Sequence, residues 1–335
     1  MNRKSSPLAT RSKELKGTAL GAGIEQLNRF ASRQAYWIHD DIVTNPGSRQ
    51  KFQDDRPALD DHQQALMGGL ENQGYSKVAV TDFFAVDASF SWDTCLSESA
   101  NFIERVERDI VKRRAKEELK AKIGKKQKGL GKGDYIMRLF GKEVPTLGLD
   151  DPWLRIGVDD RVLDVVNSYF GLWSKLTYVD LWYTPPAAPG ASRVSSQRWH
   201  RDYNDDRLVK IFIYLTDIDE DTGPLEYVPG STVGGPYGDA WPWRPLSDDL
   251  YPPQDEFEQR IPKEAQIAFT GPEGTMLFAN TSGFHRGGYA TGQRARVMAV
   301  YNYSTPASVE TLTLRNFDAD IPPDRLSEQA AYALS

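Results

Sequence analysis

A histidine and an aspartate, His200 and Asp202, lie two residues apart in the sequence. If this stretch forms a strand, both side chains leave the same face and can reach one point. Another histidine, His285, follows further along the chain. Two imidazoles and one carboxylate leave three positions of an octahedral Fe(II) open, as non-haem oxygenases require. The three residues are therefore candidate metal ligands.

Two arginines, Arg294 and Arg296, follow His285 in a run that is typical of a strand. Their side chains share one face of this predicted strand, because they are two residues apart. The planar fork of a guanidinium matches a carboxylate in a bidentate pair. An arginine in this run is therefore a candidate for binding the distal carboxylate of a keto-acid cosubstrate.

The motifs between about Tyr178 and Ser304 resemble those of the phytanoyl-CoA dioxygenase family of Fe(II)/2-oxoglutarate oxygenases. The matching residues are Trp199-His200-Arg201-Asp202, Ile213–Asp217, Gly223–Ser231, His285 and Arg296. A weaker match, Gly74–Val78, is similar to the N-terminal strand of the family. The resemblance implies a double-stranded β-helix, which is a jelly roll of the cupin-like kind with the metal at its open end.

The resemblance also implies the cofactors and their ligands. His200, Asp202 and His285 would hold Fe(II), and Arg296 would bind 2-oxoglutarate, with Arg294 as the fallback; O2 is the second cosubstrate. Related halogenases have a small residue in place of the carboxylate, so Asp202 implies an oxygenase. One departure is Thr232, which stands where family members often have a histidine. This position is not a metal ligand, so the departure concerns the shape of the adjoining pocket.

Aromatic and polar side chains near these motifs are candidates for the wall of the substrate pocket. They are Tyr183, Gln197, Trp199, Tyr203, Trp241 and Trp243. Ordinary packing explains each of them equally well. The two last tryptophans lie in a long connection over 230–262, and long ordered loops tend to be functional lids. The same tryptophans can also pack this connection onto the barrel.

The composition argues against several classes of protein. The net charge of −6 argues against global affinity for nucleic acid. The single cysteine, Cys95, allows no intrachain disulfide, which suits a reducing cytoplasm. The N-terminus lacks the apolar core of a secretory signal, and no apolar run approaches the length of a membrane span. We therefore expect a cytoplasmic protein with a small-molecule substrate.

The hydrophobic periodicity predicts a mainly β protein with flanking helices. We expect a polar, helical extension over 1–70, a jelly-roll domain over 71–310 and a C-terminal tail over 311–335. Helices are expected at 21–35, 100–123 and 151–169, and a turn at 45–48. Strands are expected at 77–84, 175–184, 208–216, 225–228, 266–269, 275–279 and 296–304. Short strands with Gly/Pro turns between them indicate a sandwich or jelly roll.

A basic stretch from Lys112 to Lys132 lies within a predicted helical insertion at about 100–135. Such charge runs usually belong to a solvated helix and a mobile loop. The alternative is a patch or lid that attracts an anionic substrate.

The residues and the resemblance together predict a 2-oxoglutarate-dependent dioxygenase. It would hydroxylate an unactivated C–H bond and release succinate and CO2. Desaturation, cyclisation or epimerisation on the same scaffold stays open, because sequence cannot separate these outcomes. A non-catalytic jelly-roll binding protein is the other alternative, although a pure binder has no need for a triad and an arginine together.

Overall fold

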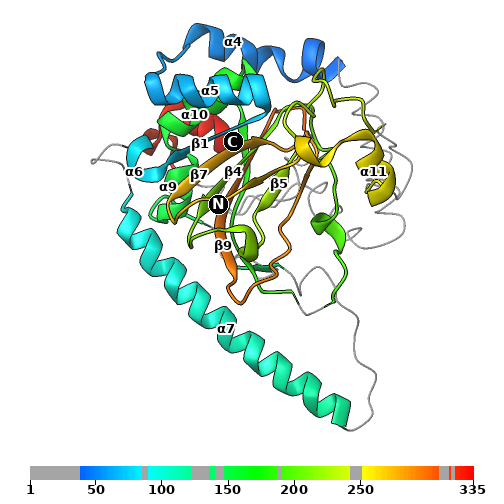
Figure 1. The fold of residues 1–335 in the computed structure, drawn as a ribbon. Helices are drawn as coiled ribbons and strands as arrows, with labels where there is room; N and C mark the ends of the chain where they lie inside the picture. Colours follow the sequence, from blue (N-terminus) through cyan, green and yellow to red (C-terminus); the bar gives the residue numbers. More distant parts are fainter. Residues whose placement is uncertain are drawn as a thin grey trace, which may run out of the picture.

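Two antiparallel sheets form the centre of the computed structural model, which describes residues 38–84, 90–122, 136–139, 147–187, 190–241, 251–308, 317 and 321–335 (Figure 1). The large sheet has the order β1 (Tyr75–Ala79), β7 (Thr275–Asn280), β4 (Leu208–Tyr214), β9 (Arg296–Ser304), β3 (Lys175–Thr184) and β2 (Met137–Arg138). The small sheet has the order β6 (Ile267–Phe269), β5 (Leu225–Tyr227) and β8 (His285–Arg286).

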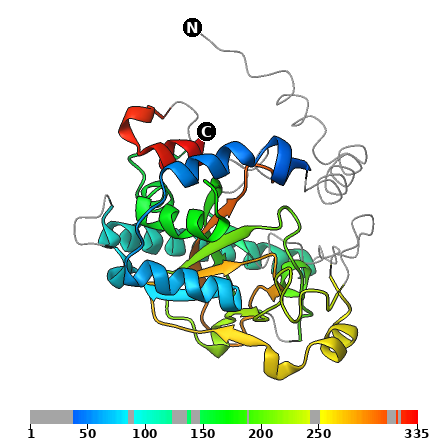
Figure 2. The same cartoon turned by 90° about the horizontal axis from the view of Figure 1, so that it is seen from above.

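Helices cover one face of the large sheet. They are α4 (Pro46–Asp54), α5 (Asp61–Gln73), α6 (Val80–Phe83), α7 (Trp92–Lys122), α9 (Pro152–Gly157), α10 (Asp160–Phe170) and α12 (Glu328–Leu334). Figure 2 shows α12 beside α4, where the Lys51 ammonium lies 5.9 Å from the ring centre of Tyr332. The long helix α7 begins against this layer, and its last turns extend beyond the sheets (Figure 1).

Local sequence signals explain where the packed helices begin and end. Asp60 and Gln63 form a reciprocal capping box at the start of α5, and Gly74, in the left-handed conformation, follows its last residue. The side chain of Asp159 caps the start of α10, and Gly171, with a φ of 66°, follows its last residue. Side-chain caps of this kind satisfy amide groups that the first turn of a helix leaves without partners.

The strands of the large sheet alternate between two hydrophobic cores. On the helix side, Val179, Ile211 and Tyr301 join one core with residues of α5, α9 and α10. On the other side, Phe212 and Val300 join a second core with residues of the small sheet. Burying one such apolar side chain completely contributes roughly 1.5–3 kcal/mol to stability. The two sheets therefore pack face to face, with the helices outside.

This arrangement confirms the predicted fold class. The protein is mainly antiparallel β with flanking helices, and its two facing sheets form a jelly roll. One further helix, α11 (Gln254–Arg260), lies in the long connection after β5. Its Phe257 packs with Trp199 and Trp241 in a third cluster.

Several predicted elements differ from the structure. The turn expected at 45–48 is wrong, because Pro46 begins α4 directly after Asn45; proline is favoured at the first helical position, where its missing N–H costs nothing. The strand expected at 77–84 ends at Ala79, because α6 begins with Val80. The expected domain boundary at residue 70 falls inside α5. The helix expected at 21–35 lies outside the described residues.

The basic stretch is described only in part. α7 extends to Lys122, and the residues from 123 to 132 lie outside the described part of the chain. None of the helices in the described residues is both long and apolar enough to cross a bilayer.

Candidate metal centre

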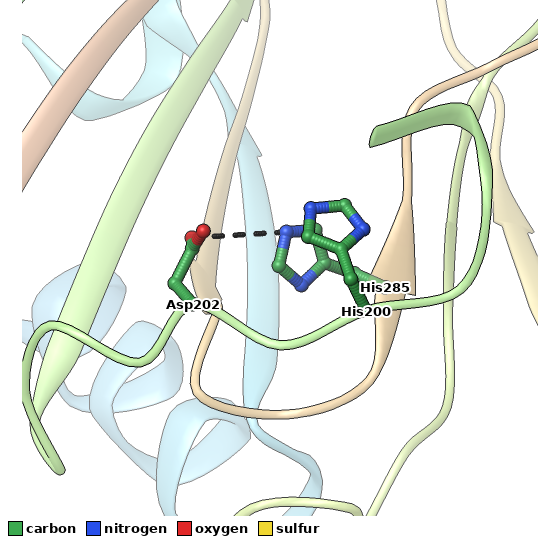
Figure 3. A group of neighbouring side chains, drawn as sticks. All are labelled: His200, Asp202 and His285. Carbon is green, nitrogen blue, oxygen red and sulfur yellow. Dashed lines mark ion pairs between the residues drawn. The ribbon is translucent and has the colours of Figure 1, made fainter. Parts of the chain in front are cut away.

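Three side chains that the sequence singled out converge between the two sheets. The potential ligand atoms of His200, Asp202 and His285 lie within 4.8 Å of one another (Figure 3). His285 belongs to β8, whereas His200 and Asp202 belong to the chain segment that leads into β4. The Nε2 atom of His285 is 3.7 Å from the Oδ2 atom of Asp202. The sequence therefore brings together the donor set of a facial metal site.

Backbone hydrogen bonds hold this segment in place, although it is not the strand that the sequence suggested. His200 and His285 form an isolated bridge, with N–H···O distances of 3.0 and 2.9 Å in the two directions. The amide of Asp202 donates to the carbonyl of Thr281 at 2.9 Å. The two side chains reach one point because both residues pair with the segment that leads into and contains β8.

The buried residue Arg201, between His200 and Asp202 in the sequence, links their segment to the loop after β5. The guanidinium of Arg201 donates to the carbonyl of Ser231 at 3.0 Å and to that of Gly238. It also lies over the ring of Phe284, 3.9 Å from the ring centre. These hydrogen bonds hold the loop after β5 against the segment that carries His200 and Asp202.

The hydrogen bonds of the two imidazoles leave the same nitrogen available on each ring. The Nδ1 atom of His200 lies 2.9 Å from the carbonyl oxygen of Arg198, and that of His285 lies 3.0 Å from the carbonyl oxygen of Gly283. A carbonyl oxygen can only accept, so each Nδ1 donates and each Nε2 keeps its lone pair. This orientation by a backbone carbonyl is the usual support of a metal-ligating histidine.

The electrostatics of the triad also suit a cation. Burial lowers the pKa of His200 to about 3, with a further contribution from His285. Burial likewise lowers the pKa of His285. Both rings are therefore neutral at pH 7 and able to act as ligands. Burial opposes the ionisation of Asp202, but the charge and the hydrogen bond of the Lys210 ammonium outweigh it and hold the pKa of this carboxyl well below its usual range.

The sequence analysis did not single out Lys210. Its ammonium donates to the Oδ2 atom of Asp202 at 2.6 Å. A signal for it was present, because Lys210 is the one charged residue in the apolar run of β4. A lysine in the middle of a buried strand needs a partner to compensate its charge.

Arg296 has the position and the unsatisfied donors of an anion-binding residue. It begins β9 opposite Thr184, whose hydroxyl accepts from its Nη2 atom at 3.3 Å. Only 2% of Arg296 is exposed, and burial lowers its pKa to about 10. Among the residues that the structure describes, no group accepts a hydrogen bond from its Nε or Nη1 atom. Buried guanidinium donors of this kind fit the carboxylate of a bound ligand.

Arg294, the alternative for this role, lies elsewhere. Its side chain is 58% exposed and forms an ion pair with Asp219. It precedes the first residue of β9, so the shared strand face expected from the sequence does not hold.

Most of the candidate pocket residues have packing or local roles. Tyr183 lies on the helix side of the large sheet and donates a hydrogen bond to Glu107 at 3.2 Å, so it faces away from the triad. Trp199 stacks on Phe257 in the third cluster, 4.9 Å between ring centres, and Trp241 belongs to the same cluster. The structure thus favours the packing interpretation for both tryptophans.

The three remaining candidates for the pocket wall are Gln197, Tyr203 and Trp243. The Oε1 atom of Gln197 accepts from the amide of Val194 at 3.1 Å, which closes a local turn. Tyr203 is buried directly after Asp202 in the sequence. Trp243 lies outside the described residues.

A tyrosine that the sequence analysis missed lies against the metal centre. The ring centre of Tyr251 is 5.5 Å from that of His200. Its hydroxyl is 3.3 Å from that of Ser195, a residue with a φ of 48°. The left-handed conformation is uncommon for residues other than glycine and often marks a functional site. Nothing in the spacing of Tyr251 pointed to this position.

The fold and the triad define a class of protein: a jelly roll with two histidines and one carboxylate at its centre, the scaffold of the iron- and 2-oxoglutarate-dependent oxygenases. A comparison with family models agrees, because residues 150–298 match the model of the phytanoyl-CoA dioxygenase (PhyH) family. The match includes all three triad residues and Arg296. The resemblance seen in the motifs is thereby confirmed over this part of the chain.

Several solved structures are similar to the chain, with low sequence identity. The non-heme alpha ketoglutarate dependent epimerase SnoN from nogalamycin biosynthesis is 13% identical, with a TM-score of 0.45, over 78% of this chain and 92% of SnoN. The carbocyclase SnoK of the same biosynthesis is 17% identical, with a TM-score of 0.45, over 80% of this chain and 91% of SnoK. EctD from S. alaskensis is 16% identical, with a TM-score of 0.42, over 75% of this chain and 78% of EctD. No curated protein matches the chain in sequence.

Proposed function

We propose that the protein is an Fe(II)- and 2-oxoglutarate-dependent dioxygenase that hydroxylates a C–H bond of a small molecule. The observation that supports it best is the triad itself, in which His200 and His285 both present Nε2 beside the carboxylate of Asp202. This donor set, with neutral rings and an ionised carboxylate, suits Fe(II). The two unsatisfied donors of Arg296 suit the far carboxylate of 2-oxoglutarate.

The triad and Arg296 would have different roles in the reaction. His200, Asp202 and His285 would hold the metal, and the carbonyls that accept from the two Nδ1 atoms would keep the rings oriented. Arg296 would orient 2-oxoglutarate through its far carboxylate. The bound metal and 2-oxoglutarate would supply the oxidising chemistry, with O2 consumed and succinate and CO2 released. The burial of His200, His285 and Arg296 would limit the access of water to the reacting groups.

Tyr251 would form part of the substrate site. Its ring lies against His200 and is half-buried, so it can contact a molecule that is bound next to the metal. Arg198 donates to the carbonyl of Tyr251 at 3.0 Å and lies over its ring, which keeps the ring in place. We propose Tyr251 as a substrate contact in place of Trp199 and Trp241.

The first test is an anaerobic titration with Fe(II) and 2-oxoglutarate, in which the chelate gives a weak visible charge-transfer band. We expect the band with the unaltered protein and its loss in Asp202→Ala. If correctly folded protein gives no band, the triad holds another metal or none. In that case the proposal fails, and a jelly-roll binding protein becomes the better interpretation.

A further inference from the structure

Lys210 occupies an unusual place in the large sheet. It lies in the middle of β4, on the same face as Phe212 and Tyr214, which is the face toward the small sheet. β4 is hydrogen-bonded on both sides, and Lys210 stands opposite Ala279 of β7 and Asn302 of β9. The backbone of Lys210 is therefore fixed, and its side chain points into the space between the sheets.

The ammonium is closely associated with a candidate metal ligand. Its distance of 2.6 Å from Asp202 is that of a charge-assisted hydrogen bond. The side chains of Lys210 and Asp202 are 13% and 20% exposed, and Phe212 and Val300 nearby on the same face are buried. Water screens charges weakly in such surroundings, so the ammonium acts on any other charge at the site.

The charges of these side chains cancel. His200 and His285 are neutral, Asp202 carries one negative charge and Lys210 one positive charge. A divalent metal adds two positive charges next to the ammonium, whereas 2-oxoglutarate adds two negative charges. By Coulomb's law, a fixed ammonium disfavours the cation and favours the dianion. One residue therefore shifts the affinities of the two cofactors in opposite directions.

We propose that Lys210 sets the charge balance of the metal centre, so that it weakens the binding of the metal alone and strengthens the binding of 2-oxoglutarate to the metal-loaded protein. This inference rests on the proposed function. Lys210 acts as a positioning residue, through Asp202 and through its charge. As a consequence, the protein would hold the metal more firmly after the cosubstrate has bound than before.

The test measures two dissociation constants under anaerobic conditions. One is that of Fe(II) alone, from equilibrium dialysis, and the other is that of 2-oxoglutarate for the Fe(II)-loaded protein, from the visible band. In Lys210→Met we expect Fe(II) to bind about tenfold more tightly and 2-oxoglutarate about tenfold more weakly. Neither readout depends on turnover.

Matched variants separate charge from hydrogen bonding. Lys210→Arg keeps the charge, and we expect both constants to stay within about threefold of the unaltered protein. Lys210→Gln keeps a hydrogen-bond donor without the charge, and we expect it to behave as Lys210→Met does; it also replaces Lys210→Met if that variant does not fold. Lys77→Met, at an exposed lysine of β1, is the control for losing a lysine elsewhere on the sheet.

The outcomes are distinguishable. Weaker binding of both ligands in Lys210→Met and Lys210→Gln would show that Lys210 only orients Asp202, and would overturn the inference. Unchanged binding of both would overturn it as well. If the unaltered protein binds neither Fe(II) nor 2-oxoglutarate, the proposed function itself fails, and the inference with it.

Discussion

The two faces of the large sheet differ in what they contribute, although the same strands form both. The helix side is apolar from β7 to β3 and packs on α9 and α10 in the main core. The inward side mixes apolar side chains with Lys210, Arg296 and Asn302. Strand residues alternate between the two faces. Val209 therefore packs in the main core, whereas its neighbour Lys210 contacts Asp202 on the inward side. The helix-side face thus contributes packing alone, whereas the inward face contributes packing and also carries the charged side chains that the proposed function uses.

The largest expected effect is on the inward side. His200→Ala removes one of three metal ligands, so we expect 2-oxoglutarate turnover to fall at least ~1000-fold, or about 4 kcal/mol in transition-state free energy. The measurement is succinate release in metal-defined buffer. His62→Ala, at an exposed histidine of α5, is the control. Persistent turnover in His200→Ala would refute the ligand assignment.

A change on the helix side is expected to affect stability and leave the site intact. Leu163 of α10 is fully buried in the main core, so Leu163→Ala creates a cavity and lowers the free energy of unfolding by about 2–5 kcal/mol. Urea unfolding measures the loss, and the Fe(II)/2-oxoglutarate band of the folded variant should be unchanged. Val111→Ala, at a side chain that is 67% exposed, should have little effect. Loss of the band at unchanged stability would contradict the division between the faces.

A smaller effect, on the affinity for 2-oxoglutarate, is expected at Arg296, the first residue of β9. Arg296→Ala removes the donors for the far carboxylate, so we expect the dissociation constant of 2-oxoglutarate to rise about 10- to 100-fold, or about 1.4–2.8 kcal/mol. The charge-transfer band measures this affinity. Arg294→Ala, which removes an exposed ion pair, should change it by less than about twofold. The opposite result would assign the role to Arg294.

The smallest expected effect is a pH dependence within the helix layer. Burial raises the pKa of Asp159, the cap of α10, from 3.8 to about 6. The folded protein therefore binds this proton more tightly than the unfolded chain, and stability falls as the pH rises from about 4 to 6. Asp159→Asn keeps an acceptor for the amide of Arg161 and should add about 1–2 kcal/mol at pH 7.5.

Urea unfolding at two pH values tests this prediction. At pH 4 the carboxyl of Asp159 is largely protonated in the folded protein, so most of the gain from Asp159→Asn should vanish there. An equal gain at both pH values would mean that the carboxyl is not perturbed by burial.

The sequence predicted the strands well where both faces of a strand are buried. β3 and β9 are buried along almost their whole length, and their bounds agree with the predicted ones. The convergence of His200, Asp202 and His285 was also expected, because spacing and motif order pointed to it. The three side chains converge for a different reason from the one expected, because an isolated bridge between His200 and His285 replaces the expected strand.

Contacts between distant segments could not be read from the sequence. Aromatic residues near a motif were candidates for the pocket wall, with ordinary packing as the alternative, and the structure shows packing for Trp199 and Tyr183. Tyr251 reaches His200 only because the long connection returns to the barrel. Hydrophobic periodicity tells which face of one element is buried, but not which distant element covers it.

The bridge between His200 and His285 has a consequence for folding. The two residues are far apart in the sequence, so the unfolded chain holds no preformed donor set, and the loop that separates them must close first. A metal that binds only the native arrangement then shifts the folding equilibrium by mass action. Chelation of the metal would therefore lower the thermal midpoint of the protein. Bound metal would stabilise the native contact between the segments that carry His200 and His285.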